Sequence, residues 1–193
     1  MEISVDALVK IDLKDEIIIF QTDTVYGVGC LLGSSEGVKR IYALKKREET
    51  KPLAVLCGSV EDVEKLVRNY SDGARLALKY WPGALTLVFK KSAEVPDFVT
   101  KNLDSVGVRI PNEPVALKIL KHFGPMAVTS LNISSQPAII KYHQALSFVN
   151  QVDYLVKGED LSSINSTVYD VQNKKVLRQG NVVIQSTLIN IGK

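Results

Sequence analysis

The sequence predicts an α/β (α+β) fold, in which helices flank a twisted mixed β-sheet within a single domain of residues 1–193. Short apolar runs typical of strands recur along the chain, and helix-like stretches separate several of them. A chain of 193 residues has the length of one domain. Its 46% hydrophobic content can form a sizeable core, and its 23% charged content is ordinary for a globular protein.

Each predicted strand is a short run rich in apolar or β-branched residues. These runs are 16–20, 53–57, 85–90, 106–110, 126–130, 153–156, 166–171 and 175–178.

The helix predictions rest on capping residues. Ser34 or Ser35 is a candidate cap for a helix that reaches about Lys46. The other expected helices are 60–68 behind Ser59 and Asp62, 72–80 behind Ser71, and 114–122 between Pro114 and Gly124. Residues 182–191 are ambiguous between strand and helix.

Composition argues against several classes of protein. A net charge of +3 suits an anionic ligand but lacks the concentrated basic patch of a nucleic-acid binder. No run approaches the ~20 apolar residues of a membrane span. Glu2 and Asp6 stand where a signal peptide would be basic, so we expect a cytoplasmic protein.

The cysteines and histidines do not form a metal motif. Cys30 and Cys57 lack CxxC spacing and lie in apolar surroundings, so both are expected to be buried thiols. His122 and His143 are too scattered for a metal cluster. We therefore expect no metal held by the protein itself.

The run QTDTVYGVG, from Gln21 to Gly29, follows an apolar stretch that ends at Phe20. A buried strand would thus deliver hydroxyls, a carboxylate and two glycines to its carboxyl end, where ligands bind in open α/β sheets. Glycine allows the backbone to approach a ligand closely.

Lys45 lies on an apolar helix stripe with Val38, Ile41 and Tyr42, at spacing i, i+3, i+4 and i+7. A lysine in this place must extend to solvent, pair, or face a cleft. A cleft facing phosphate is the sharper interpretation, because Arg47 follows and the two side chains hold polyphosphate in complementary ways.

In VGVRIP the alternation places Val106, Val108 and Ile110 on one face and Arg109 on the other. Arg109 is therefore either a surface or salt-bridged arginine, or a bidentate clamp for a carboxylate. A second polar segment follows the strand 126–130, because Ser130 and Asn132 would emerge at its carboxyl end. A plain polar turn is the alternative interpretation.

These segments, with WPGALTLV, STVYD and RQG in matching order, resemble the YrdC-like family of threonylcarbamoyl-AMP synthases from about Ile3 to Gly180. The resemblance implies an α/β domain with a large, concave, basic cleft. It also implies a nucleotidyltransferase that makes L-threonylcarbamoyl-AMP and pyrophosphate from L-threonine, bicarbonate or CO2, and ATP. A separate transferase would then place the group on tRNA beside the anticodon.

The resemblance also implies residue roles. Lys45 and Arg47 would be catalytic. L-Threonine would be bound by Thr24, Arg109, Ser130 and Ser166. ATP, with Mg²⁺ carried by the nucleotide, would be bound by Lys45, Arg47, Lys51, Ser105, Asn132 and Arg178.

The chain departs from the family pattern at Gln21, Glu48, Ile140 and Gln179. Two alternatives stay open: an RNA-binding protein of the same fold, and a diverged paralogue without synthase activity. Retention of Lys45, Arg47, Ser130 and Asn132 favours the synthase. The lack of a Ser-His-Asp set and of a P-loop favours catalysis by positioning and charge neutralisation.

Overall fold

The computed structural model describes residues 1–46, 48 and 50–185. Within them, ten strands form one mixed sheet in the order β1-β8-β2-β3-β7-β4-β6-β5-β9-β10. The strands are β1 Glu2–Ile3, β2 Ile18–Phe20, β3 Gly27–Leu31, β4 Ala54–Leu56, β5 Leu85–Lys90, β6 Ser105–Arg109, β7 Met126–Ser130, β8 Tyr154–Val156, β9 Thr167–Asp170 and β10 Lys175–Arg178.

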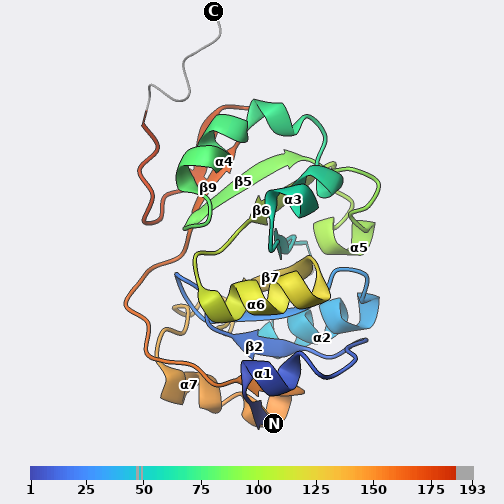
Figure 1. Ribbon diagram of the computed structural model, residues 1–193, viewed down its shortest axis with the longest axis vertical. Coiled ribbons are helices and arrows are strands. Elements are labelled where there is room, and N and C mark those ends of the chain that lie inside the picture. The colour runs from blue at the N-terminus through green and yellow to red at the C-terminus, as the bar shows by residue number, and fades with distance from the viewer. Residues whose placement is uncertain (47, 49, 186–193) are drawn as a thin grey trace, which may run out of the picture.

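Helices flank this sheet (Figure 1). The α-helices are α1 Val5–Leu8, α2 Ser35–Lys45, α3 Val60–Leu66, α4 Ala74–Tyr80, α5 Asp97–Thr100, α6 Pro114–Phe123 and α7 Tyr142–Leu146. Two 3-10 turns, η1 Tyr70–Asp72 and η2 Val149–Gln151, complete the described elements. None of the helices in the described part of the chain is both long and apolar enough to cross a membrane.

Figure 1 shows β2 and β7 in the lower half of the molecule and β5, β6 and β9 in the upper half. The segment that joins α7 to β9 runs along one side from the lower half to the upper half. The sheet is mixed, since β4 pairs parallel with β6 whereas β3 and β4 both pair antiparallel with β7. The predicted twisted mixed sheet flanked by helices is therefore confirmed.

The strands alternate between a large core and a second, smaller one. Ile19 of β2 packs in the large core, together with Val38 and Ile41 of α2. Ile18 and Phe20 point to the opposite face, where α1 and α6 cover them. The residues of β5, β6 and β9 that point to this second face line a cavity instead.

All the predicted strands and the four predicted helices are present, with bounds shifted by a few residues. The sequence did not predict β1 and β3, nor the helices α1, α5 and α7, which have only four or five residues each. Residues 182–185 form neither a strand nor a helix, and 186–191 lie outside the described residues.

The glycines of β3 were expected to let the backbone approach a ligand, and the structure corrects this expectation for Gly29. A Cβ atom at Gly29 would lie 2.8 Å from Val128 Cγ2 and 3.1 Å from the carbonyl oxygen of Ala127, both in the neighbouring strand β7. A Cβ atom at Gly27 would lie 3.0 Å from Val128 Cγ1. Gly29 therefore serves strand packing rather than ligand approach, while Gly27 also lines the cavity.

Candidate active site

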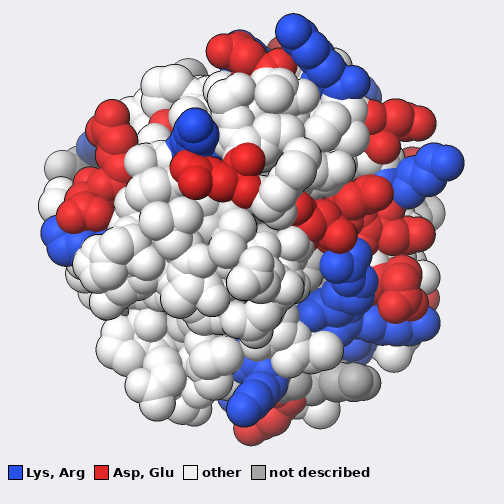
Figure 2. Space-filling view, turned by 90° about the horizontal axis from the view of Figure 1, so that it is seen from below, with Lys and Arg blue, Asp and Glu red and all other residues white. Residues whose placement is uncertain are grey.

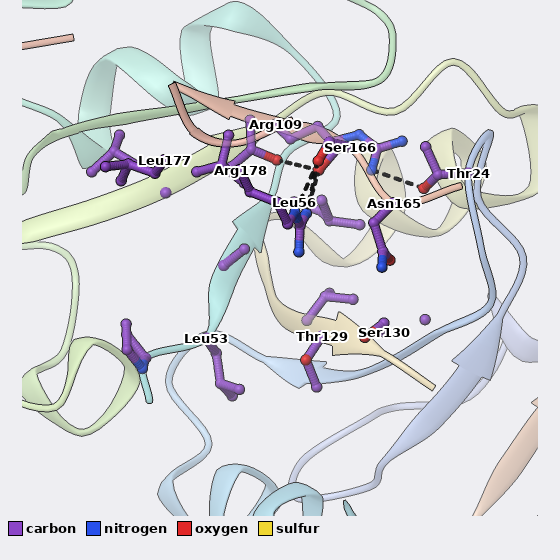
Figure 3. Close-up of a pocket in the computed structure, with 18 of the residues that line it drawn as sticks. Thr24, Leu53, Leu56, Arg109, Thr129, Ser130, Asn165, Ser166, Leu177 and Arg178 are labelled. Carbon is purple, nitrogen blue, oxygen red and sulfur yellow. Dashed lines mark hydrogen bonds between the residues drawn. The ribbon is translucent and has the colours of Figure 1, made fainter. Parts of the chain in front are cut away.

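A cavity of about 390 Å³ lies on the face of the sheet that α1 and α6 leave open. This volume is within the range of pockets that bind small molecules. Its polar wall includes Thr22, Thr24, Thr86, Ser105, Arg109, Thr129, Ser130, Asn165, Ser166 and Arg178. Figure 3 shows Arg109, Ser166 and Arg178 together on one side of the cavity, and Thr129 and Ser130 on the other.

Arg109 reaches the cavity because of strand alternation. Val106 and Val108 of β6 point into the large core, so Gly107 and Arg109 point to the cavity face. The arginine is only 5% exposed, so it is not a surface arginine, but its ion pair with Asp23 agrees with the salt-bridged alternative.

The guanidinium of Arg109 is held by three oxygens from two segments. Its Nε donates to the carbonyl oxygen of Gly83 at 2.9 Å, and its Nη1 donates to Thr24 Oγ1 at 3.0 Å. Its Nη2 donates to the carboxylate of Asp23 in a buried salt bridge. In the described part of the chain, the fork of Arg109 is thus filled on one side by an internal carboxylate.

Burial lowers the pKa of Arg109 from its ordinary value, and the negative charge of Asp23 opposes that shift. The guanidinium stays protonated, as arginine does in proteins. Three of its five N–H groups make the bonds above, and the other two have no acceptor among the described residues. A buried cation with two spare donors beside a cavity is suited to bind an anion.

A second polar cluster joins β5, β9 and β10. Ser166 Oγ lies 2.8 Å from Thr86 Oγ1, and Arg178 Nη2 donates to the same Ser166 Oγ at 3.1 Å. Arg178 also donates from Nε and Nη2 to the carbonyl oxygen of Ser166, at 3.1 and 2.9 Å. Burial lowers the pKa of Arg178, which nevertheless remains a cation on the cavity wall.

Lys45 ends helix α2, and its side chain is 1% exposed. Its Nζ donates to the carbonyl oxygen of Ser130, to that of Asn132 at 3.0 Å, and to Asn132 Oδ1 at 2.6 Å. Of the three options for a lysine on an apolar stripe, the structure shows pairing. Lys45 binds the loop after β7 and so fixes one wall of the cavity.

The amide of Asn132 is engaged within the same loop. Its Oδ1 accepts from Ser130 Oγ at 2.9 Å as well as from Lys45, and its Nδ2 donates to the carbonyl oxygens of Ile133 and Gln136. Ser130 is on the cavity wall, whereas Lys45 and Asn132 are not among the residues that line the cavity.

The structure brings six of the predicted site residues together around the cavity: Thr24, Ser105, Arg109, Ser130, Ser166 and Arg178. Lys51 is exposed and forms an ion pair with Glu48 at 3.1 Å, next to Pro52 on the cavity wall. Arg47 lies outside the described residues, so its predicted role stays a prediction.

Sequence reasoning did not identify Thr86 or Asn165, which also line the cavity. Thr86 could have been found from alternation, because it stands between Leu85 and Leu87, both in the large core. Apolar residues complete the wall: Leu53, Leu56, Val88, Leu103, Val128, Val168 and Leu177.

The departures from the family pattern have structural partners. Gln21 bridges two segments, because its Nε2 donates to Glu113 Oε1 at 2.8 Å and its Oε1 accepts from the backbone N–H of Glu159 at 2.9 Å. Gln179 Nε2 donates to the carbonyl oxygens of Gly180 and Val182. The carbonyl oxygen of Ile140 accepts from the backbone N–H of Leu161.

The two cysteines are buried, as expected. Burial raises the pKa of Cys30 to about 12 and raises that of Cys57 as well. Neither thiol is therefore a nucleophile near neutral pH. The described residues contain no group of three or more His, Cys, Asp or Glu that could hold a metal ion.

The surface in Figure 2 bears on the RNA-binding alternative. This view looks from below, at the end of the molecule that carries the N-terminus and α7, and shows acidic and basic side chains intermingled around an area with neither. The described residues on this face therefore do not form the single-sign basic patch that a nucleic-acid binder would present.

Comparisons with known proteins agree with this architecture. The Sua5/YciO/YrdC family model, described as "Telomere recombination", matches residues 11–180. A threonylcarbamoyl-AMP synthase of Pyrococcus abyssi is 35% identical over 93% of this chain and 55% of its own length. A threonylcarbamoyl-AMP synthase of Vibrio cholerae is 31% identical over 92% of this chain and 95% of its own length.

A solved structure is similar as well. The crystal structure of P. abyssi Sua5 in complex with L-threonine superimposes with a TM-score of 0.86 at 32% identity. The superposition covers 91% of this chain and 54% of the P. abyssi chain. The chain thus spans about half the length of the P. abyssi protein and nearly all of the V. cholerae one.

Proposed function

The chain belongs to the Sua5/YciO/YrdC family, and from this premise we propose that it is a threonylcarbamoyl-AMP synthase. It would join L-threonine, bicarbonate or CO2, and ATP into L-threonylcarbamoyl-AMP and release pyrophosphate. The observation that carries the proposal is Arg109, a 5% exposed cation beside the cavity with two donors unmatched among the described residues. Relatives that bear this name, one of them of similar length, support it.

The amino acid would bind at the Arg109 end of the cavity. Its carboxylate would take the two spare N–H groups of Arg109, since a guanidinium binds planar anions through parallel hydrogen bonds. Thr24 already contacts Arg109 at 3.0 Å, Ser166 supplies a hydroxyl on the same side of the cavity as Arg109, and Ser130 supplies one from the other side. These four residues would fix the amine in one place.

The nucleotide would bind toward Arg178 and Ser105. Arg178 is a cation on the cavity wall, and Leu103 and Leu177 form an apolar surface beside it. Lys45 and Asn132 would act through the loop that carries Ser130, because both contact that loop. Mg²⁺ would enter with the nucleotide, bound to its phosphates. Roles for Arg47 and Lys51 remain part of the proposal.

The chemistry needs no covalent intermediate with the protein. The amine nitrogen would attack the carbon of CO2, forming an N–C bond while a proton leaves to water. A carbamate oxygen would then attack the α-phosphorus of ATP, and the P–O bond to pyrophosphate would break. Positioned cations would offset the charge that develops on the phosphates.

The cellular setting belongs to the same proposal. A separate tRNA threonylcarbamoyl transferase would receive the product in the cytoplasm, and a weak contact between tRNA and this chain stays open. The proposal also takes residues 1–193 as one YrdC-like domain.

Pyrophosphate release by the purified protein tests the activity. With ATP and Mg²⁺, release should require both L-threonine and bicarbonate. Arg109→Ala should raise the L-threonine concentration that release requires, whereas Arg68→Ala, a control at an exposed arginine outside the cavity wall, should leave that concentration unchanged. Salt-sensitive tRNA binding without any pyrophosphate release would favour the RNA-binding alternative instead.

A further inference from the structure

Thr22 lines the cavity together with Thr24, and its hydroxyl has a defined donor direction. Thr22 Oγ1 is 2.7 Å from the carbonyl oxygen of Val25, which can only accept. The single hydroxyl hydrogen of Thr22 is therefore committed to Val25. Thr22 Oγ1 is also 3.0 Å from Thr24 Oγ1. In that contact Thr24 must be the donor.

Arg109 fixes the other side of Thr24. Its Nη1 donates to Thr24 Oγ1 at 3.0 Å, and an arginine can only donate. Hydrogen bonds thus run in one direction, from Arg109 to Thr24, from Thr24 to Thr22, and from Thr22 to Val25. The Thr24 hydroxyl has given its only hydrogen and used one of its two lone pairs.

We infer that Thr22 is a positioning residue that makes Thr24 an obligate hydrogen-bond acceptor toward the ligand in the cavity. The ligand group at Thr24 must then be a donor, such as an amine N–H. This inference rests on the proposed function, in which that group is the α-amine of L-threonine.

The spacing of the two protein groups suits an α-amino acid. Arg109 Nη1 is a donor and Thr24 Oγ1 an acceptor, 3.0 Å apart. In an α-amino acid the nitrogen and the nearer carboxylate oxygen are about 2.7 Å apart by standard bond lengths and angles. The amine and the carboxylate can therefore meet Thr24 and Arg109 side by side.

The direction of the bonds also has a chemical consequence. A hydroxyl that accepts from an amine N–H leaves the nitrogen lone pair free, and that lone pair must attack the carbon of CO2. A hydroxyl free to donate would bind the lone pair and lower its nucleophilicity. Thr22 would thus prevent the Thr24 hydroxyl from binding the lone pair of the amine that Thr24 orients.

A purely structural role for Thr22 is the competing explanation. Its oxygen also accepts from the backbone N–H groups of Thr24 at 3.2 Å and Val25 at 3.3 Å, two long bonds that share one lone pair and leave the other for Thr24 Oγ1, so it helps to hold the turn. Loss of that turn would weaken every ligand in the cavity alike. Loss of the hydrogen-bond direction would weaken only ligands that carry an amine.

The experiment compares two ligands that differ in the amine. L-Threonine and (R)-3-hydroxybutyrate share the carboxylate and the hydroxyl, but only L-threonine has the amine. Dissociation constants would be measured by NMR titration on the wild-type protein, Thr22→Val and the matched control Thr22→Ser, with ATP affinity as the check that the cavity is intact.

Wild-type protein should prefer L-threonine by about tenfold or more, the magnitude of one net hydrogen bond. Thr22→Val should lose about tenfold of that preference, whereas Thr22→Ser should retain it.

Equal weakening of both ligands in Thr22→Val, or no change in either, would overturn the inference alone. If Thr22→Val does not fold, equal affinity of the wild-type protein for the two ligands would still overturn it. ATP binding without any L-threonine binding would refute the proposed function as well.

Discussion

The salt bridge between Arg109 and Asp23 allows a quantitative test of how the cavity is held together. The two side chains are 6% and 14% exposed, and the residues are 86 apart in sequence. Removing one partner of a buried pair leaves an uncompensated charge, which costs about 3 to 5 kcal/mol. Because Asp23 is partly exposed and Arg109 lines the cavity, we expect the lower end, about 3 kcal/mol, for Arg109→Met or Asp23→Asn.

The double variant should lose less free energy of unfolding than the two single variants lose in total. Once both charges are gone, no unpaired ion remains, so the double variant should lose at most about 3 kcal/mol rather than about 6. The coupling energy would then be at least about 3 kcal/mol. Urea unfolding at neutral pH, followed by circular dichroism, measures each free energy of unfolding.

The pair Arg40 and Asp153 is the matched control. Its nitrogen and oxygen lie 2.9 Å apart, but the side chains are 37% and 31% exposed. Arg40→Met and Asp153→Asn should therefore couple by less than about 1 kcal/mol. Additive losses at Arg109 and Asp23, to within about 0.5 kcal/mol, would refute the reasoning that this buried pair is a coupled unit.

Four further predictions concern single residues. Arg109→Ala should raise the KM for L-threonine and spare the affinity for ATP, and an equal loss of both in titrations would contradict the assignment. Lys45→Met should lower the free energy of unfolding by about 2 kcal/mol or more, because it removes charge-assisted bonds to partly buried oxygens. Amide exchange around 130–132 should quicken, and unchanged exchange there would count against the role of Lys45 in holding this loop. Arg178→Lys should raise the KM for ATP about tenfold, because an ammonium cannot reproduce the fork that Ser166 receives; an unchanged KM would place the nucleotide elsewhere. Cys30 and Cys57 should resist iodoacetamide at pH 8 in the native protein and react in urea, since burial raises both pKa values and keeps the thiols protonated; rapid native alkylation would contradict their burial.

Local sequence patterns were sufficient to predict most of the helices and strands. Ser34 accepts from the backbone N–H of Gly37 and starts α2 as its type predicts, and Gly124 follows α6 where a helix stop was expected. Strand β3 was missed because Gly27 and Gly29 argue against a strand. Only the approach of Val128 from β7 explains why glycine is needed there.

The cavity was predictable in part. The alternation in β6 predicted that Arg109 points away from the core. The local sequence did not show that the carboxylate of Asp23 would form an ion pair with its guanidinium. Lys45 was predicted to matter from its place on an apolar stripe, yet its partner Asn132 is 87 residues away. Such contacts depend on tertiary packing, so a sequence pattern can identify the residues without identifying their partners.

The proposed reaction joins L-threonine and a one-carbon unit to AMP. Mass spectrometry of the reaction mixture, with ¹³C-bicarbonate, ATP, Mg²⁺ and L-threonine, would identify that product. We expect threonylcarbamoyl-AMP that carries the ¹³C label, and none of it when L-threonine is omitted. ATP that stays intact with folded, ATP-bound protein, or AMP released without any labelled conjugate, would contradict the proposal.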